Sequence, residues 1–527
     1  MKYRISKQVK VHSYRPHWKF CVGSGHAPLG LRTDYVRMLK QVHKELGIQY
    51  VRFHGIFNDD MDVVVKLSDI RPGIGCDRFV EWNFHKIGIV YDNILECGMK
   101  PFVELSFMPK TLASGEEQCI FYYKGNITPP KDYDEWVEFI RKFVEYLIHR
   151  YGQEEVRTWY FEIWNEPDLP IFFAGSKADY YRLYEVTAKA VKSVDSQLRV
   201  GGPATAGSKW VGSFLSYCRE HHVPVDFVST HQYAGDPIGG IDSTANLEEE
   251  YPPFLKMEAD YTNVLQGLEK ESVLDGLRRL MPDKSELEEL PSHGFAVNAE
   301  IVKHQAGELP VFYTEWNENA IFSAESNDTR KVAAYDLKAA LDTEKWVDAS
   351  SIWCFSDLFE EFHHFPEEFH GGFGMLTSNG IPKPVYHMFR LLSRVAENRI
   401  ELGEDATSNE IGIAAFKDTT TMQIFLFRQK MTNWELPEEI LFLEVETEWK
   451  PRAVYVTKID EEHGNPYRIW QEMGKPKDLT REEVNRIRER SMLVKELLPY
   501  KFEQGKVRIE AGLKVNDIWF IELYLQE

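Results

Sequence analysis

Eight short apolar runs, rich in β-branched and aromatic residues, limit the possible folds of this chain most strongly. They alternate with amphipathic helical patterns over the first two thirds of the sequence. Runs that are apolar on both faces and separated by helices are typical of a parallel sheet covered on both sides. Eight such units within about 340 residues predict an α/β fold, the (β/α)8 or TIM barrel, whose usual length of about 250 residues grows by loop insertions. The predicted strands are Phe20–Gly23, Gln49–Phe57, Lys100–Phe107, Thr158–Pro167, Leu198–Ala204, Pro224–Tyr233, Leu309–Asn317 and Ser350–Asp357.

Further segments surround this pattern. Residues 236–290 are charged and too long for a plain connection, so we expect a rim insertion in a barrel of residues 17–358. After the barrel, short alternating runs without long helices between them predict a C-terminal β-sandwich over 359–527. Residues 1–16 also alternate, and we expect an N-terminal strand there to join the C-terminal sheet. A capping box predicts one late helix near 480–494.

Charge and cysteine usage limit the classes of partner and of site. The chain has 62 basic and 83 acidic residues, a net charge of −21 that opposes binding to nucleic acid and to anionic membranes. We therefore expect neither as a partner. No run is apolar enough to span a membrane, and the N-terminal residues lack the apolar core of a signal peptide, so we expect a cytoplasmic location. The six cysteines lie far apart, which favours free, mostly buried thiols over a zinc site or disulfides.

Two glutamates occupy positions where barrels carry their chemistry. Glu166 ends the fourth predicted strand and Glu315 ends the seventh, each flanked by Trp and Asn. In a (β/α)8 barrel the carboxyl-terminal ends of the strands face the active site. Cleavage of a glycosidic bond needs paired carboxylates, because one protonates the departing oxygen while the other meets the oxocarbenium-like carbon. A single acid at a strand end is more often only solvated, but two across one barrel mouth predict a catalytic pair.

Several separated motifs carry a resemblance to a known family. They are WYFEIWNEPDL, FYTEWN, FHGGFGMLTSNGIPKPVYHMF, YYKGNITPP and STHQYAGDP. Together they resemble glycoside hydrolase family 39, in particular its bacterial β-xylosidase branch. This family belongs to clan A, whose barrels carry the acid/base after strand four and the nucleophile after strand seven. The resemblance runs from about His17 to Met388 and, more loosely, to the end of the chain.

This resemblance implies a mechanism and a substrate. Glu166 would be the general acid/base and Glu315 the nucleophile of a retaining double displacement, with their carboxyl groups about 5 to 5.5 Å apart. Repulsion from an ionised Glu315 would raise the pKa of Glu166. The implied activity is release of xylose from the non-reducing end of β-1,4-linked xylo-oligosaccharides, with no metal and no cofactor. A homo-oligomer is also implied, with a tetramer as one possible form.

Substrate contacts are predicted for six residues at strand ends: His54, Asn165, His231, Tyr233, Trp316 and Trp353. Asn165 resembles the clan residue that hydrogen-bonds the sugar 2-hydroxyl, a contact that strengthens in the transition state. His231 and Tyr233 resemble the clan's pair near the nucleophile, where a tyrosine hydroxyl can orient the carboxylate. His54 resembles a ligand of sugar hydroxyls. The two tryptophans are expected to form apolar walls or stacking faces, although a Trp at a strand end is core about as often.

Other polar residues follow the eighth predicted strand. His363 and His364, with His370 nearby, favour a hydrogen-bonded loop near the substrate over a metal site, because adjacent histidines on an irregular loop converge poorly on one ion. Three acids could bind sugar hydroxyls, and the sequence leaves open which of them points inward: Asp357, Glu360 and Glu361.

One residue departs from the family pattern, and several functions stay open. Asp168 stands where the family more often carries Asn, and its charge would favour the protonated form of Glu166. The same fold also serves α-L-iduronidases and arabinosidase-type enzymes, and a non-catalytic carbohydrate-binding barrel is a further alternative. Hydrolysis and glycosyl transfer differ only in the acceptor, so the sequence does not separate them.

Overall fold

A computed structural model describes residues 1–71, 73, 75–76, 78–239, 292–322, 324–362, 366–403, 410–431 and 436–525. The predicted rim insertion, apart from residues 236–239, lies outside these ranges, as do His363 and His364. Within these ranges, no helix combines the length and the apolar character that crossing a membrane requires. The six cysteines are free, and all except Cys76 are buried.

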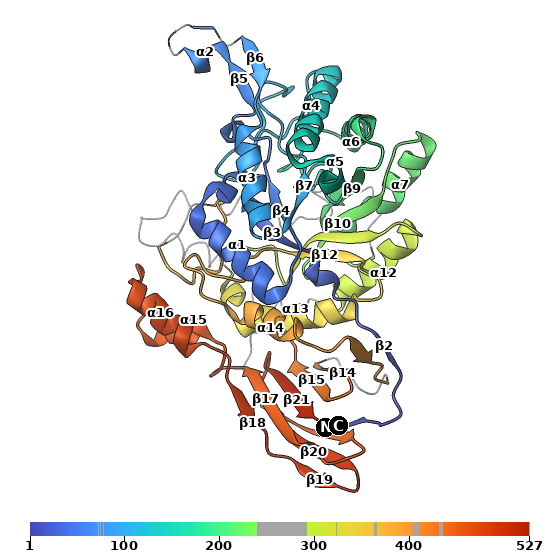
Figure 1. Cartoon of the computed structure of the whole chain (residues 1–527), viewed down its shortest axis with the longest axis vertical. Helices are drawn as coiled ribbons and strands as arrows, with labels where there is room; N and C mark the ends of the chain where they lie inside the picture. The colour runs from blue at the N-terminus through green and yellow to red at the C-terminus, as the bar shows by residue number, and fades with distance from the viewer. Residues whose placement is uncertain are drawn as a thin grey trace.

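Eight parallel strands close into a barrel, in the upper part of Figure 1. They lie in the order β10-β11-β12-β3-β4-β7-β8-β9, so each strand pairs with the one that precedes it in this series. Each overlaps one of the predicted runs, and the predicted barrel is confirmed. The strands are β3 (Cys21–His26), β4 (Tyr50–His54), β7 (Lys100–Glu104), β8 (Tyr160–Glu162), β9 (Arg199–Thr205), β10 (Phe227–Tyr233), β11 (Val311–Asn317) and β12 (Ala349–Ile352).

Helices cover the outside of the barrel, and two of the longest begin at residues with capping side chains. Asp132 accepts hydrogen bonds from the N–H groups of Asp134 and Glu135 at the start of α4. Ser176 and Asp179 form a capping box at the start of α6. The helices are α1 (Thr33–Leu46), α2 (Leu67–Ile70), α3 (His85–Glu96), α4 (Tyr133–Tyr151), α5 (Gln153–Val156), α6 (Lys177–Val194), α7 (Val211–Glu220), α12 (Gly294–Ala306) and α13 (Arg330–Asp342); a small hairpin, β5 (Val64–Lys66) and β6 (Phe79–Trp82), projects beside α2.

The amino-terminal end of the barrel is filled by a layer of mostly aromatic side chains. Its members are Phe20, Cys21, Tyr50, Phe102, Tyr160, Phe227, Phe312 and Ala349. The rings of Phe227 and Phe312 stack with their centroids 4.9 Å apart. Alternate residues of a strand point to the same face, so the residues two positions further along also point into the barrel. This alternation delivers the next inward layer.

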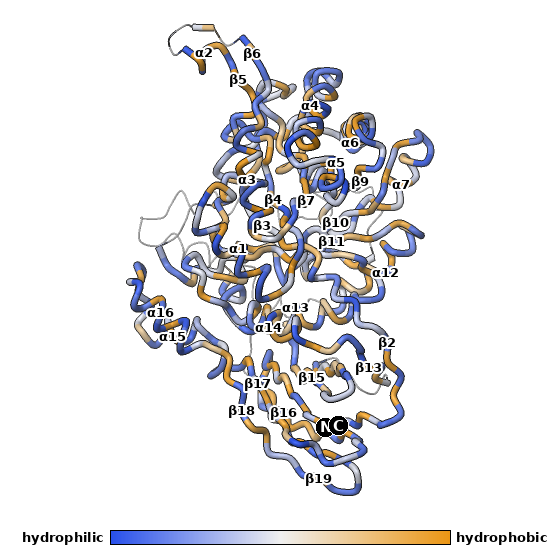
Figure 2. The backbone as a smooth tube through the Cα atoms, viewed as in Figure 1, coloured by the Kyte–Doolittle hydropathy of each residue, from blue (hydrophilic) through white to orange (hydrophobic). Residues whose placement is uncertain are grey.

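The C-terminal region is a β-sandwich of two sheets, in the lower part of Figure 1. Their orders are β1-β16-β20-β19 and β18-β17-β21-β15-β14-β13-β2. Buried residues alternate with more exposed ones along β20, and Figure 2 shows hydrophobic and hydrophilic segments interspersed through this region. The facing sides of the sheets form a separate apolar core that includes Ile413, Leu443 and Ile521. The predicted sandwich is confirmed. The strands are β1 (Lys2–Ile5), β2 (Val11–Ser13), β13 (Asn398–Ile400), β14 (Ile411–Lys417), β15 (Thr421–Arg428), β16 (Glu439–Glu446), β17 (Ala453–Ile459), β18 (Lys495–Leu497), β19 (Lys501–Glu503), β20 (Lys506–Leu513) and β21 (Ile518–Tyr524).

The N-terminal segment enters both sheets of the sandwich. β1 pairs with β16 in parallel, and β2 pairs with β13 in antiparallel fashion. The expected single N-terminal strand is therefore two strands, one in each sheet. The limits of the predicted domains at residues 16 and 358 stay a prediction.

Three helices lie in the C-terminal region: α14 (Pro384–Leu392), α15 (Pro466–Glu472) and α16 (Arg481–Arg490). Thr480 and Glu483 form the expected capping box at the start of α16. The rings of Tyr467 and Trp470 on α15 lie 5.8 and 5.5 Å from the ring of Phe369. Phe369 belongs to the segment that follows β12, so the accessory helices pack against the chain that leaves the barrel mouth.

Candidate active site

Two glutamates meet at the carboxyl-terminal end of the barrel. Glu166 follows β8 at a point where Trp164 and Glu166 have φ values of 75° and 43°, in the left-handed region that few non-glycine residues adopt. The N–H of Glu166 donates to the carbonyl of Ala204 at 2.8 Å, which holds this turn. Glu315 lies within β11, in register with His231 of β10. A carboxylate oxygen of each glutamate and a ring nitrogen of His231 lie within 4.8 Å of one another.

A fully buried arginine, Arg52 of β4, joins the carboxylates. Its Nε donates to Glu162 at 2.5 Å, and its Nη1 donates to Glu315 at 2.7 Å. Its Nη2 contacts the Oδ1 of Asn165 at 2.9 Å and the carboxylate of Glu104 at 2.9 Å. No motif in the sequence singled out Arg52. The available signal was a cation at an inward position of an apolar strand, because such a charge is buried only with partners.

His54 lies one inward position beyond Arg52 and connects several acids. Its Nδ1 is 2.8 Å from Glu104, and its Nε2 is 3.4 Å from Glu315 and 3.5 Å from Glu361. Its ring centroid is 4.9 Å from that of Trp353. Burial, together with the nearby Glu315 and Glu104, raises the pKa of Glu361 well above its usual value. Glu361 therefore keeps a proton that it can donate.

Tyr233 and His231 each hold one of the two glutamates. The hydroxyl of Tyr233 donates to Oε2 of Glu315 at 3.0 Å. The Nδ1 of His231 is 2.8 Å from Oε1 of Glu166, and its Nε2 is 3.5 Å from Nη2 of Arg52. An arginine can only donate, so Nε2 accepts and Nδ1 carries the hydrogen toward Glu166. Burial lowers the pKa of His231 to about 4, which keeps the ring neutral at neutral pH.

The two glutamates have different electrostatic surroundings. Burial raises the pKa of Glu166 to about 7, the charge of Glu104 adds to this effect, and His54 and Arg52 oppose it. Repulsion from Glu315, the cause expected from the sequence, is replaced here by burial as the main cause. Glu315, in contrast, accepts hydrogen bonds from a guanidinium and a phenol.

The two tryptophans predicted to contact the sugar lie in different places. Trp316 is fully buried and packs on Phe295 outside the barrel, with ring centroids 5.6 Å apart. The register of β11 shifts between Tyr313 and Trp316, so Thr314 and Glu315 both point into the barrel and Trp316 points out toward the helices. The predicted sugar contact of Trp316 is therefore corrected to a core position. Trp353 lies beside His54 at the barrel mouth, where its predicted role stays a prediction.

The sequence is similar to that of a known family and of two relatives. The sequence model of glycosyl hydrolases family 39 matches residues 1–274 and 283–507. The chain belongs to this family. It is 38% identical over 498 residues to a β-xylosidase of Caldicellulosiruptor saccharolyticus, which covers 94% of this chain and 92% of that protein. It is 34% identical over 518 residues to a β-xylosidase of Geobacillus stearothermophilus. This alignment covers 97% of this chain and 93% of that protein.

A solved structure agrees with this family 39 assignment. The crystal structure of a monomeric β-xylosidase from Caulobacter crescentus CB15 superposes with a TM-score of 0.77 at 27% identity, covering all of both chains. The predicted family is confirmed, and the protein is a glycoside hydrolase.

The three acids that follow β12 in this family 39 protein have different partners. Asp357 is buried against Lys383, with the Lys383 Nζ 2.8 Å from its carboxylate, so it anchors the loop. Glu360 pairs with Arg32 at 2.7 Å on the rim. Of the three, Glu361 lies beside His54 and near the carboxylates of Glu315 and Glu104. The question that the sequence left open is answered in favour of Glu361.

Asp168, which departs from the family 39 pattern, lies close to Glu166. Its Oδ1 accepts from the N–H of Ala206 at 2.9 Å, and its Oδ2 is buried with no partner among the described residues. Burial, with the nearby Glu166, raises the pKa of Asp168 to about 8. Asp168 is therefore mostly protonated at neutral pH and does not supply the full charge expected from the sequence.

Among the described residues, the one group of three His, Cys, Asp or Glu side chains with the spacing for a metal ion is Glu166, His231 and Glu315. The hydrogen bond from His231 to Glu166 and the one from Tyr233 to Glu315 account for this arrangement. His370 contacts the carbonyl of Glu367 through Nδ1 at 2.9 Å.

Proposed function

We propose that this family 39 protein is an exo-acting β-xylosidase that releases xylose from the non-reducing end of β-1,4-linked xylo-oligosaccharides with retention of configuration. The observation that carries the proposal is the pair Glu166 and Glu315. A carboxylate oxygen of one lies within 4.8 Å of a carboxylate oxygen of the other, and the two carboxyl groups have different electrostatic surroundings. This spacing supports the retaining arrangement of about 5 to 5.5 Å over the inverting arrangement of about 6.5 to 9.5 Å. The β-xylosidase names of the two relatives that match almost the whole chain support xylose as the sugar.

In the first step Glu315 attacks the anomeric carbon and Glu166 protonates the departing oxygen. Arg52 and Tyr233 hold Glu315 as an anion aimed by two hydrogen bonds. Glu166, with its pKa raised by burial to about 7, keeps its proton at mildly acid to neutral pH. His231 donates to Oε1 of Glu166, which leaves Oε2 to carry the transferable proton.

In the second step water releases the sugar from its ester with Glu315. The ester is neutral, so Arg52 loses one of its carboxylate partners, and its less compensated charge lowers the pKa of Glu166. Glu166 then ionises and takes a proton from the attacking water. Attack twice on the same carbon returns the original configuration.

The sugar hydroxyls are assigned to residues around this pair. Arg52 occupies Oδ1 of Asn165, which leaves the amide Nδ2 of Asn165 as a donor for the 2-hydroxyl. His54 and the protonated Glu361 lie together and offer donors and acceptors to the remaining hydroxyls. Trp353 supplies an apolar wall beside His54.

The test is a panel of aryl glycosides: β-D-xyloside, α-L-arabinoside, β-D-glucoside and α-L-iduronide. The wild type is measured beside Glu315→Gly, with and without azide, because removal of a nucleophile leaves space for an external anion. We expect the β-xyloside rate to dominate, to collapse in the variant, and to recover with azide to give the α-xylosyl azide. A β-xylosyl azide from the variant would assign Glu315 a role other than nucleophile.

The panel also separates the alternatives. A human α-L-iduronidase is 27% identical over only 225 residues, which are 39% of this chain and 30% of that protein, and a dominant iduronide rate would support that activity. Activity on none of the sugars by folded wild type would support a binding barrel. Products longer than the substrate would show glycosyl transfer. The expected homo-oligomer stays a prediction that light scattering tests.

A further inference from the structure

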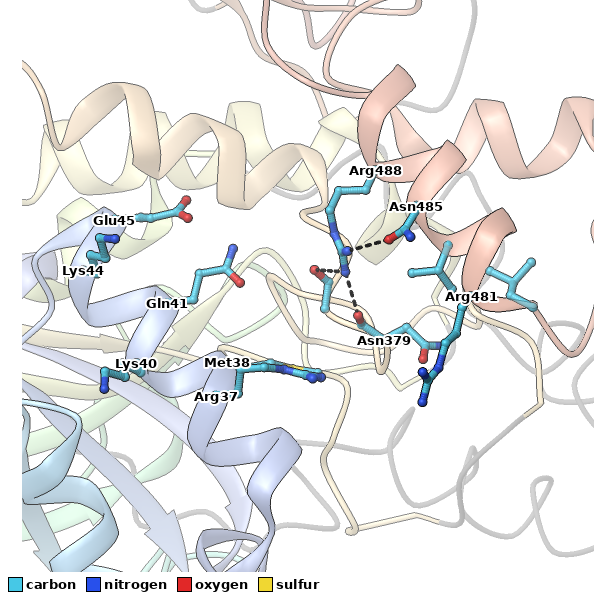
Figure 3. Close-up of a pocket in the computed structure, with 13 residues that line it drawn as sticks. Arg37, Met38, Lys40, Gln41, Lys44, Glu45, Asn379, Arg481, Asn485 and Arg488 are labelled. Atoms are coloured by element: carbon cyan, nitrogen blue, oxygen red, sulfur yellow. Dashed lines mark hydrogen bonds between the residues drawn. The ribbon is translucent and has the colours of Figure 1, made fainter.

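A cleft lies between barrel helix α1 and accessory helix α16 (Figure 3). It is separate from the site around Glu166 and Glu315, here called the carboxylate site. It encloses about 980 Å³. None of its lining residues belongs to the carboxylate site. The residues are Arg37, Met38, Lys40, Gln41, Lys44, Glu45, Asn379, Gly380, Leu479, Arg481, Val484, Asn485 and Arg488.

Basic side chains line both walls of the cleft at helical spacing. On α1, Arg37, Lys40 and Lys44 recur three and four residues apart, which places them on one face. On α16, Arg481 and Arg488 lie seven residues apart, two turns along one face. In Figure 3 Arg37 extends from α1 toward the α16 wall, where Arg481 and Arg488 project into the same space. Two helix faces thus present five cations to one cleft.

These cations lack acidic partners among the described residues. Arg488 donates to the neutral carbonyl oxygens of Asn379 and Gly380, at 3.0 and 3.4 Å. No ion pair is formed by Arg37, Lys40, Lys44 or Arg481 within the described part of the chain.

One acid, Glu45, lines the cleft, and its carboxylate also lies 3.7 Å from Arg390 outside the lining. Glu45 accepts from the hydroxyl of Tyr386 at 3.0 Å, and Glu482 contacts Arg486 at 3.4 Å. Like charges three and four residues apart on a helix repel one another and destabilise the helix. In a chain of net charge −21, the lining of this cleft therefore carries five cations and one acid.

We propose that this cleft binds a small compound carrying several phosphate groups. Guanidinium groups match phosphate oxygens in bidentate fashion, and lysines add point charges, so three arginines and two lysines suit a multivalent phosphate. The compound contacts α1 of the barrel and α16 of the accessory region at once. It is therefore bound by the folded chain and not by the unfolded one, and it stabilises the junction.

Thermal unfolding and calorimetric titration test this proposal on the full chain. The probes are tripolyphosphate, for an inorganic source, and fructose 1,6-bisphosphate, for a phosphorylated sugar, each compared with NaCl at equal ionic strength. We expect at least one probe to raise Tm by about 2 °C beyond NaCl at saturation. The tighter-binding probe identifies the source. No rise beyond NaCl with either probe would overturn the proposal.

Matched double variants locate the effect. Arg37→Gln with Arg481→Gln removes two cations from the cleft, whereas Arg141→Gln with Arg486→Gln removes two exposed cations outside its lining. We expect Kd to rise at least about tenfold in the first pair and to stay within about twofold in the second. Equal binding by both pairs would overturn the proposal. So would a wild-type dimer that the first pair dissociates, because the occupant would then be the acidic surface of a second copy.

Discussion

At the amino-terminal end of the barrel the inward side chains are mostly aromatic, whereas at the carboxyl-terminal end they are charged. The same strands supply both layers. Tyr50 lies in the aromatic layer and Arg52 two residues later lies in the charged one. In the same way, Phe102 is followed by Glu104. The change from one layer to the next costs one pleat of the strand, about 7 Å of length.

The difference shows how one barrel divides stability from chemistry. Aromatic rings at the closed end bury large apolar areas and need no polar partner. The charged end removes Arg52, Glu104 and Glu162 from water, which is costly unless each charge is paired with good geometry. The benefit of that cost is a set of carboxylates whose proton affinities differ. Substitutions at each end of the barrel test this division.

Arg52→Met should have the largest effect, because it leaves Glu104, Glu162 and Glu315 without their shared cation. We expect kcat/KM for the aryl β-xyloside to fall at least about 10³-fold, since the nucleophile loses its strongest donor. We also expect the free energy of unfolding to fall by about 3 to 5 kcal/mol. Enzyme rates and urea unfolding measure the two quantities.

Arg199→Met is the matched control at the opposite end of the barrel. Arg199 lies over the ring of Tyr160, with its guanidinium carbon 3.6 Å from the centroid. We expect kcat/KM to stay within about twofold, because no carboxylate of the site depends on it. Equal loss of activity in both arginine variants would contradict the division between the two ends.

Phe312→Ala should show the reverse pattern. Phe312 is buried in the aromatic layer and contacts Phe227 there. We expect unfolding free energy to fall by about 3 to 5 kcal/mol, with kcat/KM within about twofold of wild type below the unfolding transition. Phe79→Ala, on the exposed hairpin, serves as the control for loss of a ring. A fall in kcat/KM without a change in the urea midpoint would argue against the prediction.

The pH dependence of kcat/KM should report Glu166. Its pKa is raised to about 7, so the proton that catalysis needs is present below pH 7 and is lost as pH rises through that value. We expect an alkaline limb near pH 7 with an aryl xyloside that needs acid catalysis.

Glu166→Gln checks the assignment. With a dinitrophenyl leaving group, which departs without a proton, the variant should still form the glycosyl enzyme, and its alkaline limb near pH 7 should disappear. An unchanged limb in Glu166→Gln would mean that another group titrates there.

Asp168→Asn should have the smallest effect. The raised pKa of Asp168, about 8, means that an amide replaces a group that is already mostly neutral at pH 7. We expect kcat/KM within about twofold of wild type and no shift of the limb near pH 7. A downward shift of that limb by one pH unit would restore Asp168 as a charge that acts on Glu166.

The strand pattern and the strand-end motifs were predictable from sequence because they are local. Glu166, Glu315 and Tyr233 stand at positions that the barrel itself brings together, and the structure joins them by short hydrogen bonds or a common register. The aromatic layer was not predicted as a layer, although its members lie near the starts of the predicted strands.

The rest depended on contacts between distant strands. Arg52 is one cation in an apolar run, and its partners Glu104 and Glu162 lie on two other strands, so sequence offers no spacing that links them. Strict alternation from Phe312 would turn Trp316 inward, and the register shift of β11 that turns it outward has no signal in the sequence. The cause of the raised pKa of Glu166 depends on burial, which sequence does not measure.

The pairing of β1 with β16 also fixes an order of events during translation. The partner of Lys2, Phe442, is made 440 residues after it, a delay of about 20 to 90 s at usual elongation rates. The strands of the barrel are complete before that, so the barrel can close while β1 waits unpaired. An unpaired strand can pair with a strand of another chain and so promote aggregation. The charged residues Lys2 and Arg4 in β1 oppose such pairing. β1 can therefore pair only after the barrel strands and β16 have been made.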